Sequence, residues 1–211
     1  MPGFSVPAVR RYLPTLLMLV GVLLLAYVAL QYAAMHLEQR RLAQEWERQN
    51  QAVLPPDRQG DAKMLPAKTD SGKPGAIRLQ VPSISLDSMV VEGTSNKALS
   101  LGPGRMTSTA IPGEQGNAVI TAHRDTIFRH IQELNKGDEI LVQRNGRTFR
   151  FGVTRKQIVE PTDVWVLNPT QDSQLTLITC YPTYYIGPAP QRLVVFSRLL
   201  DSKLSDSKLP E

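Results

Sequence analysis

One uninterrupted apolar segment near the N-terminus constrains the fold of this chain more than any other feature. Residues Leu13–Leu30 carry no charged side chain, and about 20 apolar residues are enough for a helix to cross a bilayer. Tyr12 and Tyr32 flank the segment, as aromatic residues commonly do at membrane edges. A cleaved signal peptide is the competing interpretation, but the run is longer than usual for one, and Ala33-Ala34 is only an approximate cleavage site. We therefore predict an uncleaved transmembrane anchor over residues 13–32.

The charges around this anchor give a small bias in orientation. Arg10 and Arg11 precede the anchor, while Arg40 and Arg41 follow it closely. The positive-inside rule therefore only slightly favours a cytoplasmic position for residues 1–12.

The composition changes twice after the anchor. Residues Met35–Gln51 are rich in Glu, Gln and Arg and lack Gly and Pro, which predicts a polar helix that continues the anchor. Proline, glycine and serine then accumulate over residues 52–75, as in a linker. We expect 33–75 to be a juxtamembrane helix and linker, 76–200 to be the folded domain, and 201–211 to be a flexible tail.

The folded domain has the sequence pattern of short β-strands. Ile77, Leu79 and Val81 alternate with polar residues, as in a half-buried strand. Asn145-Gly146 separates two strand-like runs, and this dipeptide is a strong hairpin signal because both turn residues need positive φ. Residues Thr126–Leu134 have apolar residues at helical spacing and predict a short helix. Seven or eight such strands with few helices predict an all-β fold, a small closed β-barrel with short helices.

Charge and cysteine content exclude several classes of function. The net charge is +5, but the basic residues are scattered without a run of five, and no zinc spacing or RNA-binding motif is present. We therefore expect no nucleic-acid partner. A single cysteine in 211 residues excludes an internal disulfide framework and a metal site built from several cysteines.

That cysteine, Cys180, lies at the end of the apolar strand-like run Leu175–Thr179, shortly before Pro182. A lone cysteine is more often a small buried hydrophobic residue than a nucleophile. A thiol at the end of a rigid strand can nevertheless face a groove and attack a substrate. A free thiol outside the cytoplasm is also exposed to oxidation, so an exported chain that keeps one is expected to use it.

Two further side chains could complete thiol chemistry. His123 ends the apolar run Ala118–Ala122, and a histidine there could move protons between the sulfur and a leaving amine. Arg192 opens the last predicted strand, Leu193–Leu200, and its guanidinium could stabilise an oxyanion. Read singly, a structural histidine and a surface arginine are the commoner interpretations.

These three residues lie in motifs that resemble one enzyme family. Thr176-Leu177-Ile178-Thr179-Cys180 is similar to the TLxTC signature of the sortases, which are cysteine transpeptidases. The segment from Ala118 to Asp125, which contains His123, resembles the sortase strand that ends in the catalytic histidine. Arg192 matches the position of the family's essential arginine. The resemblance covers about residues 76–200 and is greatest to class D.

The resemblance implies an eight-stranded sortase barrel and a role for each motif residue. Cys180 would attack a threonine-like carbonyl in an LPxTG-like sorting motif and form a thioacyl intermediate. His123 would act as general acid and then as general base, and Arg192 would hold substrate and oxyanion. The amine acceptor would be a peptidoglycan precursor or a pilin lysine.

The resemblance also bears on the groove, the metal and the location of the protein. The loop before the cysteine strand would supply Val164, Trp165 and Val166 as apolar groove residues. Some sortases bind calcium, but Glu92, Glu114 and Asp125 do not form a convincing cluster, so we predict no cofactor and no metal. Sortases act outside the cytoplasmic membrane, which implies a single-pass protein with an extracytoplasmic catalytic domain.

Other interpretations remain open at the level of sequence. L,D-transpeptidases also use Cys and His, but their cysteine follows a Ser-x-Gly context, whereas Thr179 precedes Cys180 and Tyr181-Pro182 follows it. Papain-like hydrolases usually place the cysteine before the histidine, the reverse of the order here. A different class of protein, a non-catalytic membrane-tethered β-barrel that binds a peptide or scaffolds a complex, is the main alternative.

Overall fold

The computed structural model describes residues 6–53, 75–184 and 187–204. The chain divides into two compact units, Met1–Glu38 and Gln39–Glu211, and the boundary falls inside helix α1 (Val6–Val53). Residues 54–74, which make up most of the predicted linker, lie outside the described residues, as do residues 205–211 of the predicted tail.

Helix α1 is long and carries large apolar side chains that are exposed, such as Leu16, Leu19 and Leu25. Among the described residues it is the one helix long and apolar enough to cross a membrane. The first unit is therefore compatible with a membrane anchor. The helix also continues through the polar segment after the apolar run, as predicted, and Pro14 lies inside it.

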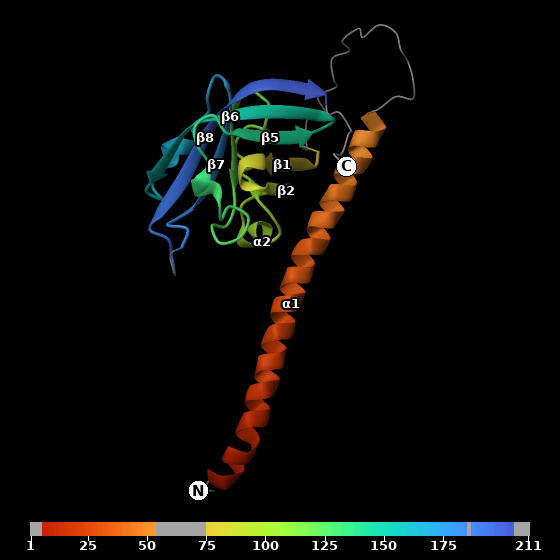
Figure 1. The fold of residues 1–211 in the computed structure, drawn as a ribbon, viewed down its shortest axis with the longest axis vertical. Helices are drawn as coiled ribbons and strands as arrows, with labels where there is room; N and C mark the ends of the chain where they lie inside the picture. The colour runs from red at the N-terminus through yellow and green to blue at the C-terminus, as the bar shows by residue number, and fades with distance from the viewer. Residues whose placement is uncertain (1–5, 54–74, 185–186, 205–211) are drawn as a thin grey trace. The chain divides into compact units, whose positions relative to one another are not determined.

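Within the described residues, eight strands form a closed barrel (Figure 1), which confirms the predicted fold class. The strands are β1 (Ile77–Val81), β2 (Leu86–Glu92), β3 (Gly104–Arg105), β4 (Gly116–Thr121), β5 (Glu139–Arg144), β6 (Arg147–Val159), β7 (Ser173–Tyr181) and β8 (Gln191–Leu204). Their order around the barrel is β1-β2-β3-β4-β7-β8-β6-β5, and β5 pairs with β1 to close it. Strand β8 runs past residue 200, where the last strand was expected to end.

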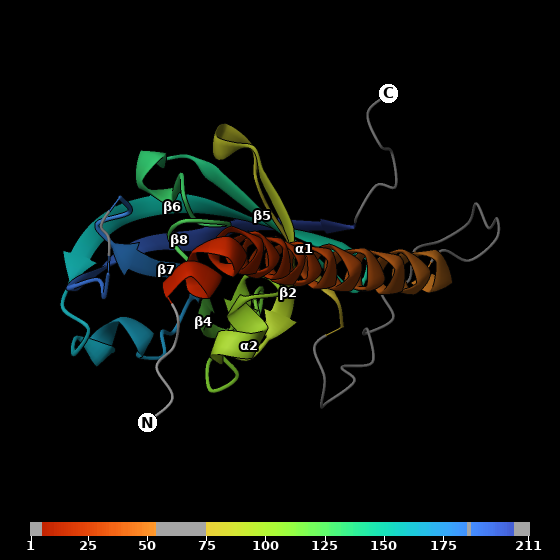
Figure 2. The same ribbon diagram turned by 90° about the horizontal axis from the view of Figure 1, so that it is seen from below.

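Short helices connect several of these strands. They are η1 (Pro82–Ile84), α2 (Asn96–Leu99), η2 (Ile131–Glu133) and η3 (Val164–Leu167). The predicted hairpin is confirmed: β5 and β6 pair around Asn145 and Gly146, with φ of 48° and 68°. The long strands β6 and β8 lie side by side (Figure 2), with register shifts that mark bulges in their pairing.

The prediction of a short helix at α-helical spacing over Thr126–Leu134 was wrong in the type of structure. This segment forms successive tight turns and then the 3₁₀-helix η2, with i→i−3 bonds such as Leu134 N to Ile131 O. Its fully buried residues are Phe128, Ile131 and Leu134, which are three residues apart. That spacing matches the three residues per turn of a 3₁₀-helix, so burial of these side chains in the barrel core favours tight turns over an α-helix.

Two apolar clusters lie on opposite faces of the strands. The alternation along β7 sends Leu175 and Leu177 into the main core, while Ile178 packs against a smaller second cluster. The second cluster consists of Val159, Val166, Val194 and Phe196. Because residues two apart share a face, Cys180 lies on the same face of β7 as Ile178, and thus on the side of the second cluster.

Candidate active site

Strand β7 places Cys180 next to Arg192. The cysteine lies one residue before the end of β7 and is partly exposed. Strands β7 and β8 are antiparallel, and in their register Cys180 and Arg192 are directly paired. This pairing brings the end of β7 against the start of β8, so the two side chains start from adjacent positions on one face.

Parallel pairing of β4 with β7 brings His123 to the same end of the barrel. The last paired residues are Thr121 and Ile178. His123 follows Thr121 by two residues, and Cys180 follows Ile178 by two residues. The two strands stay attached beyond this pair, because Ala122 N donates to Ile178 O at 3.3 Å. The Thr179 hydroxyl also donates to Ala122 O at 2.8 Å. The exposed His123 is therefore held next to the cysteine strand by its preceding residue.

The guanidinium of Arg192 is folded back on its own loop. Its Nη1 donates to the carbonyls of Ala189 at 3.2 Å and Gln191 at 2.9 Å. These bonds restrain a half-buried arginine beside the strand end. Its planar fork has further N–H groups available to a carbonyl or an oxyanion.

The predicted groove residues in η3 differ in environment. Val166 is buried in the second cluster, whereas Val164 and Trp165 are 66% and 40% exposed. The Trp165 ring stacks on Phe196 with centroids 6.0 Å apart, and the Arg155 guanidinium lies 4.0 Å from the centroid of Phe196. Val166 thus anchors the segment, while Val164 and Trp165 present apolar surface to solvent.

Asn117 was not among the residues that we predicted for the site. It is buried, and its Nδ2 donates to the carbonyls of Val166 at 2.9 Å and Asn168 at 3.2 Å. Its Oδ1 accepts from the Thr176 hydroxyl at 2.7 Å and from Gln174 Nε2 at 3.1 Å. One amide therefore ties η3 to both β4 and β7. The available signal was an asparagine at the start of an otherwise apolar strand.

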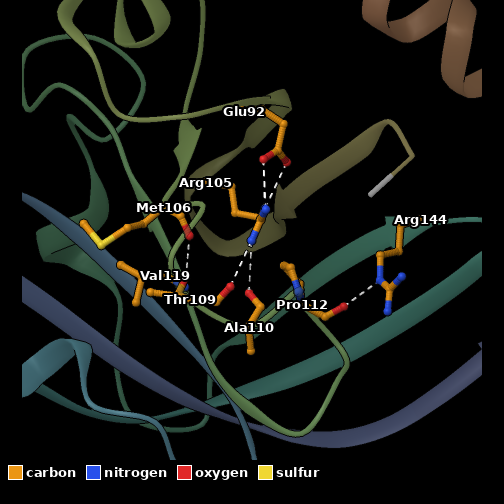
Figure 3. Close-up of polar contacts among 8 residues, drawn as sticks. All are labelled: Glu92, Arg105, Met106, Thr109, Ala110, Pro112, Val119 and Arg144. Carbon is orange, nitrogen blue, oxygen red and sulfur yellow. Dashed lines mark hydrogen bonds and ion pairs between the residues drawn. The ribbon is translucent and has the colours of Figure 1, made fainter. Parts of the chain in front are cut away.

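A buried arginine supports the strands that precede the histidine (Figure 3). Arg105 contacts Glu92 through Nε and Nη2, both at 2.9 Å, and its Nη1 donates to Thr109 O at 3.0 Å. The Thr109 hydroxyl donates to Met106 O and accepts from Val119 N in β4. This network fixes the connection from β3 to β4.

Arg144 makes a second contact of this kind, also drawn in Figure 3. Its Nε donates to Pro112 O at 2.7 Å. Its Nη2 also pairs with Glu114, which the figure does not draw, at 3.2 Å. Burial lowers the pKa of the Arg144 guanidinium, against the opposing effect of Glu114.

The three carboxylates considered for calcium lie in different surroundings. Glu92 is paired with Arg105, Glu114 is paired with Arg144, and Asp125 is exposed. No group of three His, Cys, Asp or Glu side chains suited to a metal ion occurs in the part of the chain that the structure describes.

Comparison with known proteins places this arrangement in a family. A family model described as the sortase domain matches residues 79–200. Sortase D of Bacillus subtilis (strain 168) is 33% identical over 132 residues, which cover 62% of this chain and 66% of that protein. Sortase A of Listeria monocytogenes is 32% identical over 106 residues, 48% of this chain and 47% of that protein. The matches thus span two thirds or less of these relatives.

Solved structures give the same fold. A sortase D5 transpeptidase of Clostridium perfringens has a TM-score of 0.62, with 21% identity, over 80% of this chain and 99% of that one. Sortase A of Listeria monocytogenes has a TM-score of 0.57, with 26% identity, over 62% of this chain and 90% of that one. The sortase model covers the barrel from β1 to β8, together with the strand ends that carry Cys180, His123 and Arg192, and on this evidence the chain belongs to the sortase family.

Proposed function

We propose that this protein is a membrane-anchored cysteine transpeptidase that cleaves an LPxTG-like sorting motif and transfers the acyl part to an amine. The observation that carries the proposal is the register at the end of β7. Cys180 is directly paired with Arg192, and His123 follows the β4 residues that are paired with the same strand. Nucleophile, proton carrier and cation therefore start from adjacent strand ends, as acyl transfer needs.

In the first half-reaction, Cys180 Sγ attacks the carbonyl carbon of the threonine-like residue. The thiol proton passes through His123 to the leaving amine, the C–N bond breaks, and a thioester remains on Cys180. The Arg192 guanidinium stabilises the negative charge that develops on the carbonyl oxygen. For this it gives up, or shares, its bonds to the loop carbonyls of Ala189 and Gln191.

In the second half-reaction, an acceptor amine attacks the thioester carbonyl. His123 now takes a proton from that amine, the C–S bond breaks, and the thiol is regenerated. The proposed acceptor is a peptidoglycan precursor or a pilin lysine. The reaction needs only side chains of this chain, so we propose no cofactor.

The substrate would lie along the face of β7 and β8 that carries the second cluster. The exposed apolar surface of Val164 and Trp165 supports a binding role for the Leu-Pro part of a sorting motif. Val166 would act indirectly, by holding η3 against Val194 and Phe196. Apolar surface beside a few polar groups is typical of peptide-binding grooves.

We also propose that α1 anchors the protein in the cytoplasmic membrane with the barrel on the extracytoplasmic side. The apolar, exposed first part of α1 supports this location. Sorting-motif proteins and their wall or pilin acceptors would be met there.

The test uses the full chain in detergent with a library of LPxTG-like peptides and an added amine such as triglycine. We expect amine-dependent product and a thioester on Cys180 detected by mass spectrometry. Cys180→Ala should abolish both. His123→Ala and Arg192→Ala should each lower turnover by about a hundredfold or more.

Two matched variants control for general damage. His130 is exposed and paired with Glu133, and Arg198 is exposed on the same strand as Arg192. Changing either to alanine should leave turnover close to wild type. Unchanged cleavage in Cys180→Ala would contradict catalysis by this thiol. Peptide affinity that survives Cys180→Ala, with no thioester on the unaltered chain, would favour a non-catalytic peptide binder. Product that stays hydrolytic at high amine would contradict transpeptidation.

A further inference from the structure

We propose that Arg124 is a positioning residue for His123, a role that rests on the proposed function of the site. Arg124 directly follows His123, and its guanidinium bridges two carbonyls of the connection between β7 and β8. Its Nη1 donates to Pro182 O at 3.2 Å, and its Nη2 donates to Gly187 O at 2.7 Å. This connection leads from Cys180 to Arg192.

The backbone on both sides of His123 is thereby restrained. Before it, Ala122 is bound to β7 through Ile178 O and the Thr179 hydroxyl. After it, Arg124 holds the chain to the segment that follows β7. His123 itself is exposed, so packing contributes little to its placement. Its position relative to the thiol thus depends on these backbone restraints. On the far side its own carbonyl accepts from Phe128 N at 3.1 Å, and the Arg124 bonds join the chain directly after it to the segment that follows Cys180.

The same connection also holds Arg192. Ala189 O, two residues beyond Gly187, accepts from Arg192 Nη1. The connection between β7 and β8 therefore accepts hydrogen bonds from two guanidinium groups, those of Arg124 and Arg192. Arginine suits the first task because its rigid planar fork presents two parallel N–H directions, whereas lysine offers a point charge on a flexible stem.

Removal of the Arg124 side chain should leave the barrel folded. The segment after His123 is independently anchored in the core by Phe128, Ile131 and Leu134, all fully buried. The segment between β4 and β5 also keeps a second link to the segment between β7 and β8, because the Thr183 hydroxyl donates to Gln132 Oε1 at 2.8 Å. The expected defect is therefore in geometry at the site and not in folding.

The experiment measures alkylation of Cys180 by iodoacetamide as a function of pH, with the full chain in detergent. This readout needs no peptide substrate and reports how the imidazole acts on the thiol. We expect His123→Ala to shift the midpoint of the profile and Arg124→Ala to shift it in the same direction. In the double variant, Arg124→Ala should add no further shift, since it acts through His123.

Peptide turnover supplies the second readout. Arg124→Ala should lower kcat by about ten- to a hundredfold, the scale expected for a misplaced catalytic group, with KM little changed. Arg124→Lys should recover part of the loss, because it can reach one carbonyl at a time. Arg129 is an exposed arginine on the segment between β4 and β5, which also carries Arg124. Arg129→Ala is therefore the matched control and should behave as wild type.

The outcomes separate the two proposals. If His123→Ala leaves the alkylation profile unchanged, the histidine does not act on the thiol, and the proposed catalytic pair falls together with the role of Arg124. If His123→Ala shifts the profile and Arg124→Ala does not, only the positioning role is overturned. A shift by Arg124→Ala that persists in full on the His123→Ala background overturns it as well.

Discussion

Asn117 gives the sharpest test of how the groove is built. Its amide makes four hydrogen bonds that connect β4, β7 and η3, and the side chain is 2% exposed. Replacement by alanine removes all four bonds, and each group that was bonded to the Asn117 amide then loses that partner. The two bonds least accessible to water are those with Val166 O and the Thr176 hydroxyl.

The magnitude follows from those two buried partners. Each buried polar group left unpaired costs about 1–3 kcal/mol. The carbonyl of Asn168 and the amide of Gln174 are only partly buried, so water can replace their lost bonds. Asn117→Ala leaves Val166 O unpaired, whereas the Thr176 hydroxyl keeps the bond that it accepts from Gln174 and so costs less. The free energy of unfolding of the barrel should therefore fall by about 2–4 kcal/mol.

Loss of these bonds should also affect binding more than chemistry. Without Asn117, η3 loses its side-chain hydrogen bonds to β4 and is held by the packing of Val166 and the stacking of Trp165 on Phe196, so we expect Val164 and Trp165 to be less well ordered. We expect KM for a sorting-motif peptide to rise about tenfold, equivalent to about 1.4 kcal/mol, while kcat changes little.

The assay combines urea unfolding, followed by near-ultraviolet circular dichroism, with steady-state peptide kinetics. Gln174→Ala is the matched control, because the Gln174 side chain bonds to Asn117 and Thr176, which both lie on strands and not in η3. It should lower stability by under about 1 kcal/mol and leave KM unchanged. A loss below about 0.5 kcal/mol in Asn117→Ala, or equal KM effects in both variants, would refute this reasoning.

Three further predictions concern residues outside the groove. Arg105→Met should lower the free energy of unfolding by about 2–4 kcal/mol, less than for a fully buried pair because Glu92 is 44% exposed; denaturant titration checks this, and Arg147→Met, on the exposed start of β6, is the control. Gly113→Ala should destabilise the barrel by about 2 kcal/mol, since its φ is +91° and a Cβ there would overlap the Phe149 ring; a thermal midpoint equal to wild type would contradict it. Burial alone would raise the pKa of Asp87, but hydrogen bonds from Arg78 and Gln80 outweigh it and lower that pKa. The resulting stability is present above the unfolded pKa of the carboxyl and is lost as pH falls through the folded pKa. Asp87→Asn should therefore flatten the acid side of the stability–pH curve.

The barrel and the positions of the motif residues were predictable because they depend on local patterns. Alternating residues in β1 and the Asn145-Gly146 turn each specify their own backbone geometry. The cysteine and arginine lie at strand ends that apolar runs and a proline-rich loop delimit in sequence. Pairing between these strands then follows from closure of the barrel.

The remainder depends on tertiary contacts that no local window contains. Helical spacing could not distinguish the half-buried Ile127 from the fully buried Phe128, because packing in the barrel core decides which of the two side chains is enclosed. The bonds of Asn117 and Arg124 join residues about fifty or sixty positions apart. Contacts over such separations leave no periodic trace in the sequence.

The place of β7 between β4 and β8 has a consequence for how the site matures. One neighbour of the cysteine strand, β4, precedes it in the chain, and the other, β8, is the last of the described strands. Non-local pairings of this kind form late and slowly in folding. A nascent chain that ends before β8 can contain the thiol and the imidazole but lacks the guanidinium and one edge of the groove. The proposed site is therefore complete only once β8 has been synthesised, and the proposed function predicts that a chain released before β8 does not cleave sorting-motif peptides.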